Sequence, residues 1–453
     1  MHSRPEQDPQ QLAEARRIYS EILARTPEHD FDPTLDRVRR TVDLLGSPQH
    51  AYRVIHVTGT NGKTSTARMA ERLVREHGLR TGLFTSPHLA DVRERIAIDG
   101  EPISPESFVE VWSIVSPVVD LVDAELGAAG QSRLSFFEVL TVMALVAFAE
   151  APVDVAVLEV GMGGSWDSTN VADGEVAVVT SVALDHERYL GDTIEQIAEV
   201  KSGIIKPGAT VVVGELREEA LTVVGDVAAQ QGARLVREGL EVAVLERQLA
   251  VGGQLMTLRG LGGVYADVFV PLHGEHQAHN ALLALVAGEA LLSDGAPLSA
   301  EAVGQAFATV TSPGRIELAR VSPAVLVDAA HNPAGALALA ATIEEAFDFR
   351  TLVGVIGVLD DKDPEGILSV LEPVLAHVVV TRSSSHRALD PEELGEIARD
   401  VFGEDRVHVV DRLDAAIDTA VQLSEHEDTL GAGVLVTGSV TMVADARHLL
   451  GRA

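Results

Sequence analysis

Short apolar runs rich in β-branched residues alternate with longer helical segments through much of this chain. Early examples are "YRVIHVTG", "VDVAVLEVG" and "EVAVVTSVA". Runs of this kind predict strands buried on both faces, and their alternation with helices predicts a parallel sheet with crossover helices. Two of the helical segments begin with a capping-box pattern, Ser135 with Glu138 and Thr193 with Gln196.

A chain of 453 residues is too long for one ordinary hydrophobic core, so we expect at least two domains. Residues 233–272 carry glycine pairs and alternating apolar positions, which predict antiparallel hairpins attached to the first domain. Alternation of strands and helices restarts after the segment "TSPGR", and we therefore place two domains at 1–311 and 312–453. Residues 1–16 are polar and contain prolines, and we expect them to be disordered.

The composition excludes several classes of protein. The chain has no cysteine, which excludes disulfides and thiolate metal sites, and its formal net charge of −33 argues against a nucleic-acid partner. No apolar run reaches the roughly 18 residues needed to span a bilayer, and the N-terminus lacks the plan of a signal peptide. We therefore expect a cytoplasmic protein that acts without a membrane.

The stretch "VTGTNGKTST" resembles a phosphate-binding loop but departs from the usual spacing. The pattern G-x-x-x-x-G-K-[ST] needs a glycine where this chain has Val57. The stretch nevertheless follows a predicted strand and opens a predicted helix, as a phosphate loop must. Gly59 and Gly62 would allow close approach of the backbone, Lys63 could reach the phosphates, and Thr64 is placed for Mg²⁺. The alternative is a plain glycine turn before a helix.

Lysine is rare in this chain. Lysine and arginine total 35, yet only four are lysine, at positions 63, 201, 206 and 362. Lysine differs from arginine because its amine can be deprotonated and modified. The residues alone leave open whether Lys201 is functional or merely solvated, and whether "DDKD" at 360–363 is more than a polar loop.

Polar residues follow the predicted strands of the first domain. Glu159 ends the strand in "LEVGMGG", and Asp185 and His186 follow the next strand in "TSVALDH". Ligands of open α/β sheets bind at the carboxyl ends of the strands, where a buried carboxylate needs a partner or a cation. Because Mg²⁺ prefers oxygen ligands, these residues alone favour a hydrogen-bonding role for His186.

The second domain repeats this arrangement. "VDAAHNP" places Asp328, His331 and Asn332 at a strand end, and "VTGS" places Ser439 at another. Arg315 lies just past the domain boundary, where a cation could reach the phosphates of ATP. Together these residues predict a ligand site at the carboxyl edge of a second sheet.

Taken together, the motifs resemble those of the folylpolyglutamate and dihydrofolate synthases of the Mur ligase superfamily. They are "TGTNGKTST", "TSPHL" with "ERI", "SFFE", "LEVGMGG" with "DSTN", "TSVALDH" with "LGDT", "GEHQAHNA", "PGRIE", "DAAHNP", "LDDKD" and "TGSVTMVADAR", in the family's order from about residue 35 to 450. The resemblance implies a P-loop, Mur-ligase-type ATPase domain with a parallel sheet and a hairpin segment, followed by a Rossmann-like α/β domain.

The resemblance also implies an ATP-dependent amide ligase. ATP would phosphorylate a carboxylate of dihydropteroate or of folate polyglutamate, and the amine of L-glutamate would attack the acyl phosphate. Positioning and charge neutralisation would do most of the work. The cofactors implied are ATP and Mg²⁺, as one ion or two, with a monovalent cation as a further candidate and Lys201 carbamylated. The partners would be these small molecules alone, and the protein a monomer.

The family motifs assign a role to each matching residue. ATP would be held by Gly59, Thr60, Asn61, Gly62, Lys63, Thr64, Ser65, Gln277, Asn280, Arg315 and Asp328, with Gln277 and Asn280 facing the adenine. Mg²⁺ would be ligated by Thr64, Ser86, Glu159 and His186, which replaces the hydrogen-bonding interpretation of His186. The folate site would include Pro87, His88, Arg95, Asp361 and Ser439, with Arg93 nearby. Catalytic roles would fall to Lys63, Lys201, Asp328 and His331.

Two departures from the family pattern bear on activity. The family commonly has arginine in "GGRxDATN", where this chain has Ser165, and "EKAGI" is replaced by "VKSGI" around Lys201. Loss of that arginine would affect rate or acceptor preference. Two alternative functions stay open: a Mur-type ligase of cell-wall peptides, and a non-catalytic ATP-binding regulatory protein. The segments "TSPHL" and "LDDKD" favour the folate ligase.

Overall fold

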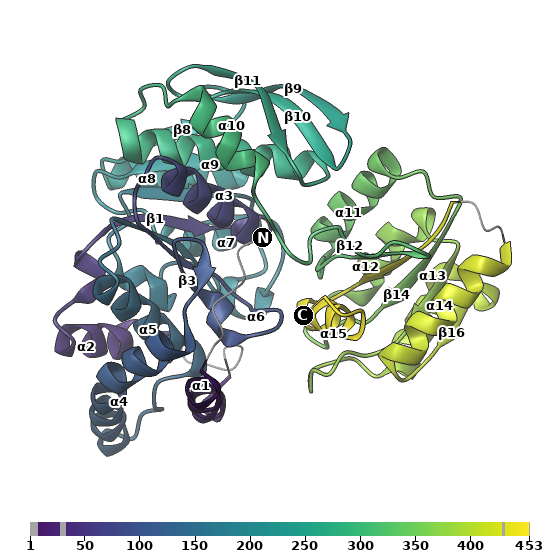
Figure 1. Cartoon of the computed structure of the whole chain (residues 1–453), viewed down its shortest axis with the longest axis horizontal. Helices are drawn as coiled ribbons and strands as arrows, with labels where there is room; N and C mark the ends of the chain where they lie inside the picture. Colours follow the sequence, from purple (N-terminus) through teal and green to yellow (C-terminus); the bar gives the residue numbers. More distant parts are fainter. Residues whose placement is uncertain (1–7, 28–32, 428–430, 453) are drawn as a thin grey trace.

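The computed structural model describes residues 8–27, 33–427 and 431–452. It contains two α/β bodies side by side, one built from the first two thirds of the chain and one from the remainder (Figure 1). The α/β fold with parallel sheets predicted from the sequence is confirmed. The boundary that we place between residues 311 and 312 falls in the connection between the last helix of the first body and the first strand of the second.

The first body is organised around an eight-stranded sheet in the order β4-β3-β2-β5-β1-β6-β7-β8. All neighbouring strands from β2 to β8 run parallel, whereas β3 and β4 add an antiparallel edge. The strands are β1 (Arg53–Thr58), β2 (Thr81–Phe84), β3 (Ile96–Ile98), β4 (Glu101–Pro102), β5 (Val155–Glu159), β6 (Val176–Val179), β7 (Thr210–Val213) and β8 (Arg234–Arg237).

Helices cover both faces of this sheet, which is why its central strands are apolar at successive positions. In β1, Val54 packs into one hydrophobic cluster while Ile55 and Val57 pack into the cluster on the opposite face. The helices of this body are α1 (Pro9–Leu23), α2 (Asp36–Leu44), α3 (Lys63–Glu76), α4 (Pro105–Ala128), α5 (Phe136–Glu150), α6 (Glu187–Leu190), α7 (Ile194–Ser202), α8 (Glu218–Gln230), α9 (Glu275–Ser293) and α10 (Ala300–Ala308).

The N-terminal region corrects the expectation of disorder over residues 1–16. Residues 1–7 lie outside the described residues, but α1 begins at Pro9, with Asp8 accepting a hydrogen bond from the backbone N–H of Gln10. Ala15 and Ile18 on this helix are buried against α4 and α5. The few apolar residues of α1 are separated by charged and polar ones, so the overall composition of the segment gave no sign of a helix.

The two predicted capping boxes differ in the structure. Ser135 accepts from the backbone N–H of Glu138, and the Glu138 carboxylate accepts from that of Ser135, so the first box is confirmed. Thr193 likewise caps α7 by accepting from Gln196. The Gln196 side chain, however, accepts from the backbone N–H of Asp192, so the second box is incomplete.

A small antiparallel sheet, β11-β10-β9, packs beside α9 and α10 (Figure 1). Its strands are β9 (Ala243–Ala250), β10 (Gly253–Arg259) and β11 (Val264–Val270). The predicted hairpins are therefore present, but they begin later than residue 233. Residues 234–237 form β8 instead, because they pair in parallel with β7 and extend the main sheet.

The second body has a six-stranded sheet in the order β12-β13-β17-β14-β15-β16, parallel except for the edge strand β12. Its strands are β12 (Glu317–Arg320), β13 (Ala324–Val327), β14 (Thr351–Ile356), β15 (His377–Val380), β16 (Val407–Val409) and β17 (Ala432–Thr437). Its helices are α11 (Pro333–Ala346), α12 (Pro364–Leu371), α13 (Pro391–Phe402), α14 (Leu413–Glu427) and α15 (Val440–Leu449).

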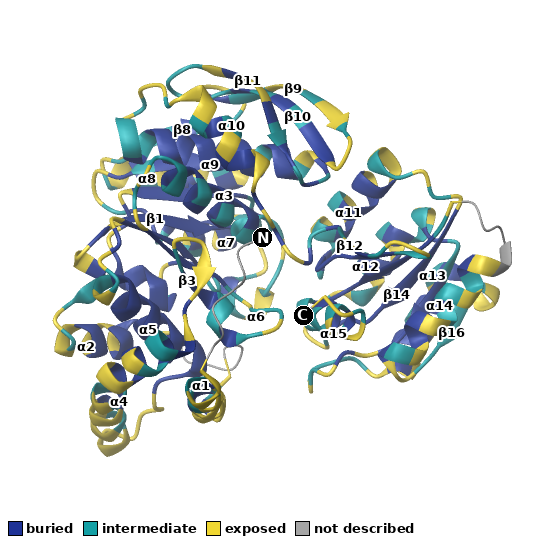
Figure 2. Cartoon of the chain, in the orientation of Figure 1, coloured by how far each residue is buried: buried dark blue, intermediate teal, exposed yellow. Residues whose placement is uncertain are grey.

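Burial follows this layered arrangement. The central strands of both sheets are buried, and exposed residues lie mainly on the outer faces of the covering helices and on the hairpin sheet (Figure 2). Within the described ranges, no helix is both long enough and apolar enough to cross a bilayer.

Candidate active site

A cavity of about 480 Å³ lies where the carboxyl ends of the two sheets face each other. Most residues that the sequence assigns to a site line this cavity. They are Thr60, Asn61, Gly62, Lys63, Thr64, Ser65, Ser86, Pro87, Glu159, His186, Gln277, Asn280, Arg315, Asp328, His331 and Ser439. Eight others do not line it: Gly59, Lys201, His88, Arg95, Asp361, Asp185, Asn332 and Arg93.

The phosphate-like loop connects β1 to α3. Gly59 and Gly62 have φ values of +151° and +85°, which favour glycine. The Lys63 ammonium donates to the main-chain oxygens of Gly59 and Thr60, each at 3.0 Å. Burial lowers the pKa of Lys63, while the nearby carboxylates of Glu159 and Asp185 oppose this change. The loop therefore holds a cation at a helix N-terminus, a site suited to an anion.

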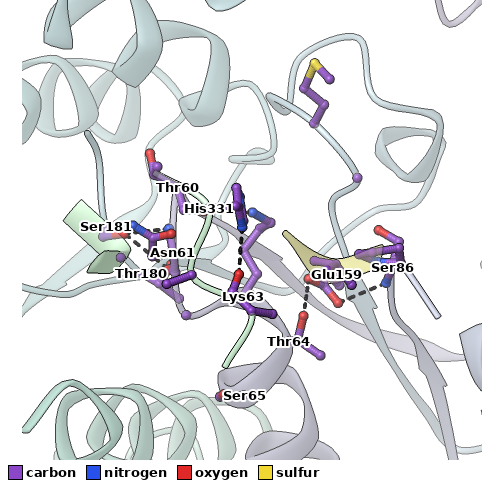
Figure 3. Close-up of a pocket in the computed structure, with 18 of the residues that line it drawn as sticks. Thr60, Asn61, Lys63, Thr64, Ser65, Ser86, Glu159, Thr180, Ser181 and His331 are labelled. Carbon is purple, nitrogen blue, oxygen red and sulfur yellow. Dashed lines mark hydrogen bonds between the residues drawn. The ribbon is translucent and has the colours of Figure 1, made fainter. Parts of the chain in front are cut away.

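Oxygen atoms gather on one side of Lys63 (Figure 3). The Thr64 hydroxyl donates to Glu159 Oε1 at 2.7 Å, and the backbone N–H of Ser86 donates to Oε2 at 3.1 Å. Burial raises the pKa of Glu159, whereas Lys63 and Thr64 lower it. A carboxylate next to hydroxyl groups fits the preference of Mg²⁺ for oxygen ligands.

His186 lines the same cavity, but the nearest side chain to its Nε2 in the hydrogen-bond geometry is Lys362 rather than Glu159. Its Nε2 is 3.4 Å from the ammonium of Lys362, and burial lowers the pKa of its imidazole to about 3, so the ring is neutral. A neutral imidazole can ligate a metal, but its ring nitrogen already faces Lys362. Among residues 8–27, 33–427 and 431–452, no three histidine or carboxylate side chains gather to hold a metal by themselves.

Lys201 is buried behind the phosphate loop. Its ammonium donates to the main-chain oxygen of Gly59 at 2.9 Å. Burial, assisted by the charge of Lys63, lowers the pKa of Lys201 to about 7. The solvated-lysine alternative is therefore wrong, and a substantial fraction of this amine is neutral near pH 7.

A polar contact joins the two bodies beside the loop. The Asn332 amide donates to Asn61 Oδ1 at 3.1 Å and to Asp185 Oδ2 at 3.0 Å. Lys362 donates to Asp185 Oδ1 at 2.6 Å, and His331 Nε2 lies 3.6 Å from Oδ2. Burial alone would raise the pKa of Asp185, but these cationic and hydrogen-bonding partners lower it well below its usual range.

Asp328 holds two backbone segments together at the start of the second body. Its carboxylate accepts from the backbone N–H groups of Ile316 at 2.9 Å and Ala330 at 2.8 Å. Burial raises the pKa of Asp328, whereas the charge of Arg315 lowers it. This carboxylate thereby fixes the turn that carries Arg315 and the loop that carries His331.

Gln277 and Asn280 lie in the first turns of α9 and pack against α3. Asn280 accepts from the Thr66 hydroxyl at 3.2 Å and donates to Gln277 Oε1 at 3.1 Å. Gln277 in turn donates to the Ser65 hydroxyl at 3.4 Å. A Cβ added to Gly62 would meet Asn280 Oδ1 at 2.5 Å, so this face of α9 adjoins the phosphate loop.

In the segment "TSPHL", only Ser86 and Pro87 reach the cavity. His88 and Arg95 lie behind them: Arg95 Nε donates to His88 Nδ1 at 2.9 Å, and His88 Nε2 is 3.3 Å from the Tyr19 hydroxyl. Because Nδ1 accepts, the proton of a neutral His88 ring is on Nε2. These residues support the wall of the cavity rather than line it.

The family of the chain follows from its similarity to known proteins. The Mur ligase middle domain matches residues 57–288, and the Mur ligase, glutamate ligase domain matches residues 314–440. The dihydrofolate synthase/folylpolyglutamate synthase of Mycobacterium tuberculosis is 49% identical, over 98% of this chain and 95% of that protein. The chain belongs to the folylpolyglutamate synthase family of Mur ligases.

Solved structures of folylpolyglutamate synthases share the fold. Mycobacterium tuberculosis folylpolyglutamate synthase complexed with ADP and AMPPCP superposes with a TM-score of 0.93 at 49% identity, covering 98% of this chain and 99% of that one. E. coli FolC in complex with DHPP and ADP gives a TM-score of 0.82 at 30% identity, covering 96% and 97%. The resemblance stated from the motifs is confirmed, and the folate-ligase family is favoured over the cell-wall and regulatory alternatives.

This family member carries its unusual Ser165 on the surface. Ser165 is exposed and does not line the cavity, although Trp166 and Asp167 beside it do. Its backbone N–H donates to the main-chain oxygen of Val200 at 2.8 Å, next to Lys201. The serine therefore stands at an exposed position that does not itself line the cavity.

The remaining second-domain candidates have distinct places in this folylpolyglutamate synthase fold. Ser439 is buried, lines the cavity, and caps α15 by accepting from the backbone N–H of Met442. Asp361 lines a smaller neighbouring cavity and pairs with Arg387 at 3.2 Å. The sequence singles out Lys362 as one of four lysines and as part of the motif "LDDKD". Its pairing with Asp185 could not be predicted, because it depends on how the two bodies dock.

Proposed function

We propose that this protein is an ATP-dependent ligase that joins L-glutamate to dihydropteroate, to the γ-carboxylate of folate polyglutamate, or to both, through an acyl phosphate. The observation that carries the proposal is one cavity lined by the phosphate loop of the first body and by Arg315, His331 and Ser439 of the second. We further propose that it acts as a monomer in the cytoplasm.

The nucleotide end would use charges that the fold already positions. Lys63, at the N-terminus of α3, would neutralise the phosphates, and Arg315 would approach them from the second body. Arg315 suits this role because its guanidinium lines the cavity and makes no hydrogen bond or ion pair with the residues described. Thr64, Ser86 and Glu159 would hold Mg²⁺, which supplies neutralisation of the phosphate charge when bound.

The acceptor end would lie on the opposite side of the loop. Pro87, Phe137, Met162 and Trp166 give this part of the cavity an apolar and aromatic wall. Such a wall suits a flat aromatic ring system, which the folate acceptors carry. The acceptor carboxylate would attack the γ-phosphorus of ATP and release ADP. The glutamate amine would then attack the acyl carbon, releasing phosphate and a proton.

Lys201 would be carbamylated and help to order the metal region. The reaction joins the neutral amine nitrogen to the carbon of CO₂ and releases a proton, so it requires a deprotonated amine. Burial lowers the pKa of Lys201 to about 7, which supplies that form. An arginine could not be modified in this way, which gives the retention of lysine a reason.

The test is release of phosphate from ATP that depends on both glutamate and an acceptor. Dihydropteroate and tetrahydrofolate are supplied separately, with controls that omit glutamate or acceptor. We expect release with at least one of them. A folded protein that binds ATP but releases phosphate with neither would refute the ligase proposal. Release with a muramyl peptide precursor instead would support the cell-wall alternative.

A further inference from the structure

One apolar side chain of the first body packs into the core of the second. Each hydrophobic cluster is otherwise made of residues from a single body, and Leu89 is the one exception among the residues that the structure describes. Leu89 follows β2 in the segment "TSPHL", yet it packs against the cluster of the second body that contains Val443 of α15. This apolar contact favours one docked arrangement of the two bodies.

The contact falls on the turn that carries Arg315. A Cβ added to Gly314 would meet Val443 Cγ1 at 2.9 Å and Leu89 Cδ1 at 3.4 Å, so methyl groups of both residues lie against this glycine. The backbone N–H of Gly314 donates to Glu317 Oε2 at 2.8 Å, which ties the turn to β12 of the second body. Arg315, the next residue, lines the cavity. Leu89 therefore adjoins the segment that presents the guanidinium to the cavity.

The loop that carries Leu89 lines the cavity at its other end. Ser86, three residues earlier, lines the cavity, and its backbone N–H donates to Glu159 Oε2 at 3.1 Å (Figure 3). Leu89 itself does not line the cavity. The loop thus joins the oxygen cluster beside Glu159 to the turn of the second body.

Hydrogen bonds close the loop over residues 85–95 on itself. At its base, the backbone N–H of Thr85 donates to the main-chain oxygen of Arg95 at 3.0 Å. The Glu94 carboxylate accepts from the backbone N–H of Leu89 at 2.9 Å and from those of the next two residues at 3.1 and 3.0 Å. A loop fixed in this way moves as a unit, so a displacement of Leu89 also shifts Ser86.

We propose that Leu89 is a positioning residue that couples the 85–95 loop of the first body to the Arg315 turn of the second. Its place against Gly314 and Val443 sets the separation of Ser86 and Arg315 across the cavity. The consequence for turnover rests on the proposed function, because both of those residues would then face the reacting groups. The coupling between loop and turn does not rest on it.

Hydrogen–deuterium exchange of the full-length protein, followed by mass spectrometry, tests the coupling without any substrate. In Val443→Ala we expect the backbone amides of residues 85–95 to exchange at least about threefold faster, although the substitution lies in the other body. The reciprocal variant, Leu89→Ala, alters a surface loop and should accelerate exchange at residues 312–317. Leu449→Ala is the matched control, because this leucine is exposed at the end of α15, and both segments should exchange as in the wild type.

Turnover tests the positioning role. It is expressed per ADP-binding site, so that unfolded enzyme does not count. We expect Leu89→Ala to lower kcat by roughly 10- to 100-fold while the affinity for ADP changes less than about threefold. Leu89→Met, which keeps the side-chain volume, should restore most of kcat. Because the two residues share one contact, Leu89→Ala combined with Val443→Ala should lose little more than the larger single loss.

Unchanged exchange of both segments in folded Val443→Ala and Leu89→Ala proteins would overturn the coupling. Undiminished kcat in Leu89→Ala would overturn the positioning role, as would losses that multiply in the double variant. A wild type that ligates no glutamate, but in which the variants accelerate exchange across the two bodies, would support the coupling while refuting the proposed function.

Discussion

Replacement of Asn332 with aspartate tests whether the polar contact between the two bodies is needed for turnover. The Asn332 amide nitrogen donates to Asp185 Oδ2 at 3.0 Å, while its oxygen accepts from the backbone N–H of Gly335 at 2.7 Å and caps α11. An aspartate keeps the capping acceptor. It replaces the donor with a second carboxylate that faces Asp185.

The cost follows from the distance between the two groups. Unit charges 3.0 Å apart repel by roughly 5 kcal/mol at an effective dielectric constant of about 20. Lys362, which lies 2.6 Å from the other oxygen of Asp185, offsets part of this repulsion, leaving about 2–3 kcal/mol. Asn332→Ala, by contrast, removes the helix cap, which costs about 1 kcal/mol, and the hydrogen bonds to Asn61 and Asp185, but it adds no repelling charge. The repulsion between the two carboxylates in Asn332→Asp can be relieved if the two bodies move apart.

Small-angle X-ray scattering and steady-state turnover measure this outcome. At neutral pH we expect Asn332→Asp to have a larger radius of gyration than the wild type and at least about tenfold lower turnover. Asn332→Ala should melt earlier but scatter more like the wild type. Acidification should restore compactness to the aspartate variant, because a protonated carboxyl can donate to Asp185. A compact and fully active Asn332→Asp protein at neutral pH would refute the reasoning.

Three further predictions concern single buried residues. Lys201→Arg should fold but lose most turnover, since a guanidinium is not carbamylated, and full activity would rule out the carbamate role. Gly59→Ala should destabilise the protein by about 2 kcal/mol and weaken ADP binding in a titration, because its φ is +151° and an added Cβ would collide with Thr180; unchanged melting and affinity would contradict this. Burial lowers the pKa of His56 from 6.5 to about 3, so the unfolded chain takes up a proton over a range in which the folded protein does not. The free energy of unfolding should therefore fall as the pH drops from 6.5 to 3, by up to about 5 kcal/mol, and more gently in His56→Gln; equal slopes in urea denaturation would count against this account.

Much of the framework was predictable from local patterns. Strands such as β1 and β5 are apolar on both faces because helices cover them on both sides, and that composition is visible in the sequence. The loop before α3 could be located because a strand, two glycines and a lysine occur in a fixed order. The family motifs predicted site residues at the carboxyl edges of two sheets, and the cavity lies between these edges.

The features that we could not predict from the sequence depend on contacts between segments that are far apart along the chain. Residues 234–237 alternate like a hairpin strand but extend the main sheet, because they pair in parallel with β7, a segment more than 20 residues earlier in the chain. The helix α1 lies in a polar region whose apolar positions matter only against α4 and α5. Glu238 belongs to no motif, and only the docking of α9 places it beside His279.

The central claim is that a substrate carboxylate is activated as an acyl phosphate, and the fate of its oxygen tests this most directly. The acceptor is prepared with isotopically labelled oxygen in the reacting carboxylate, and the released phosphate is analysed by mass spectrometry after ligation of glutamate. In an acyl phosphate mechanism one carboxylate oxygen leaves with the phosphate, so the account predicts one labelled oxygen in each phosphate released. Phosphate free of label, formed together with the glutamyl product, would contradict it.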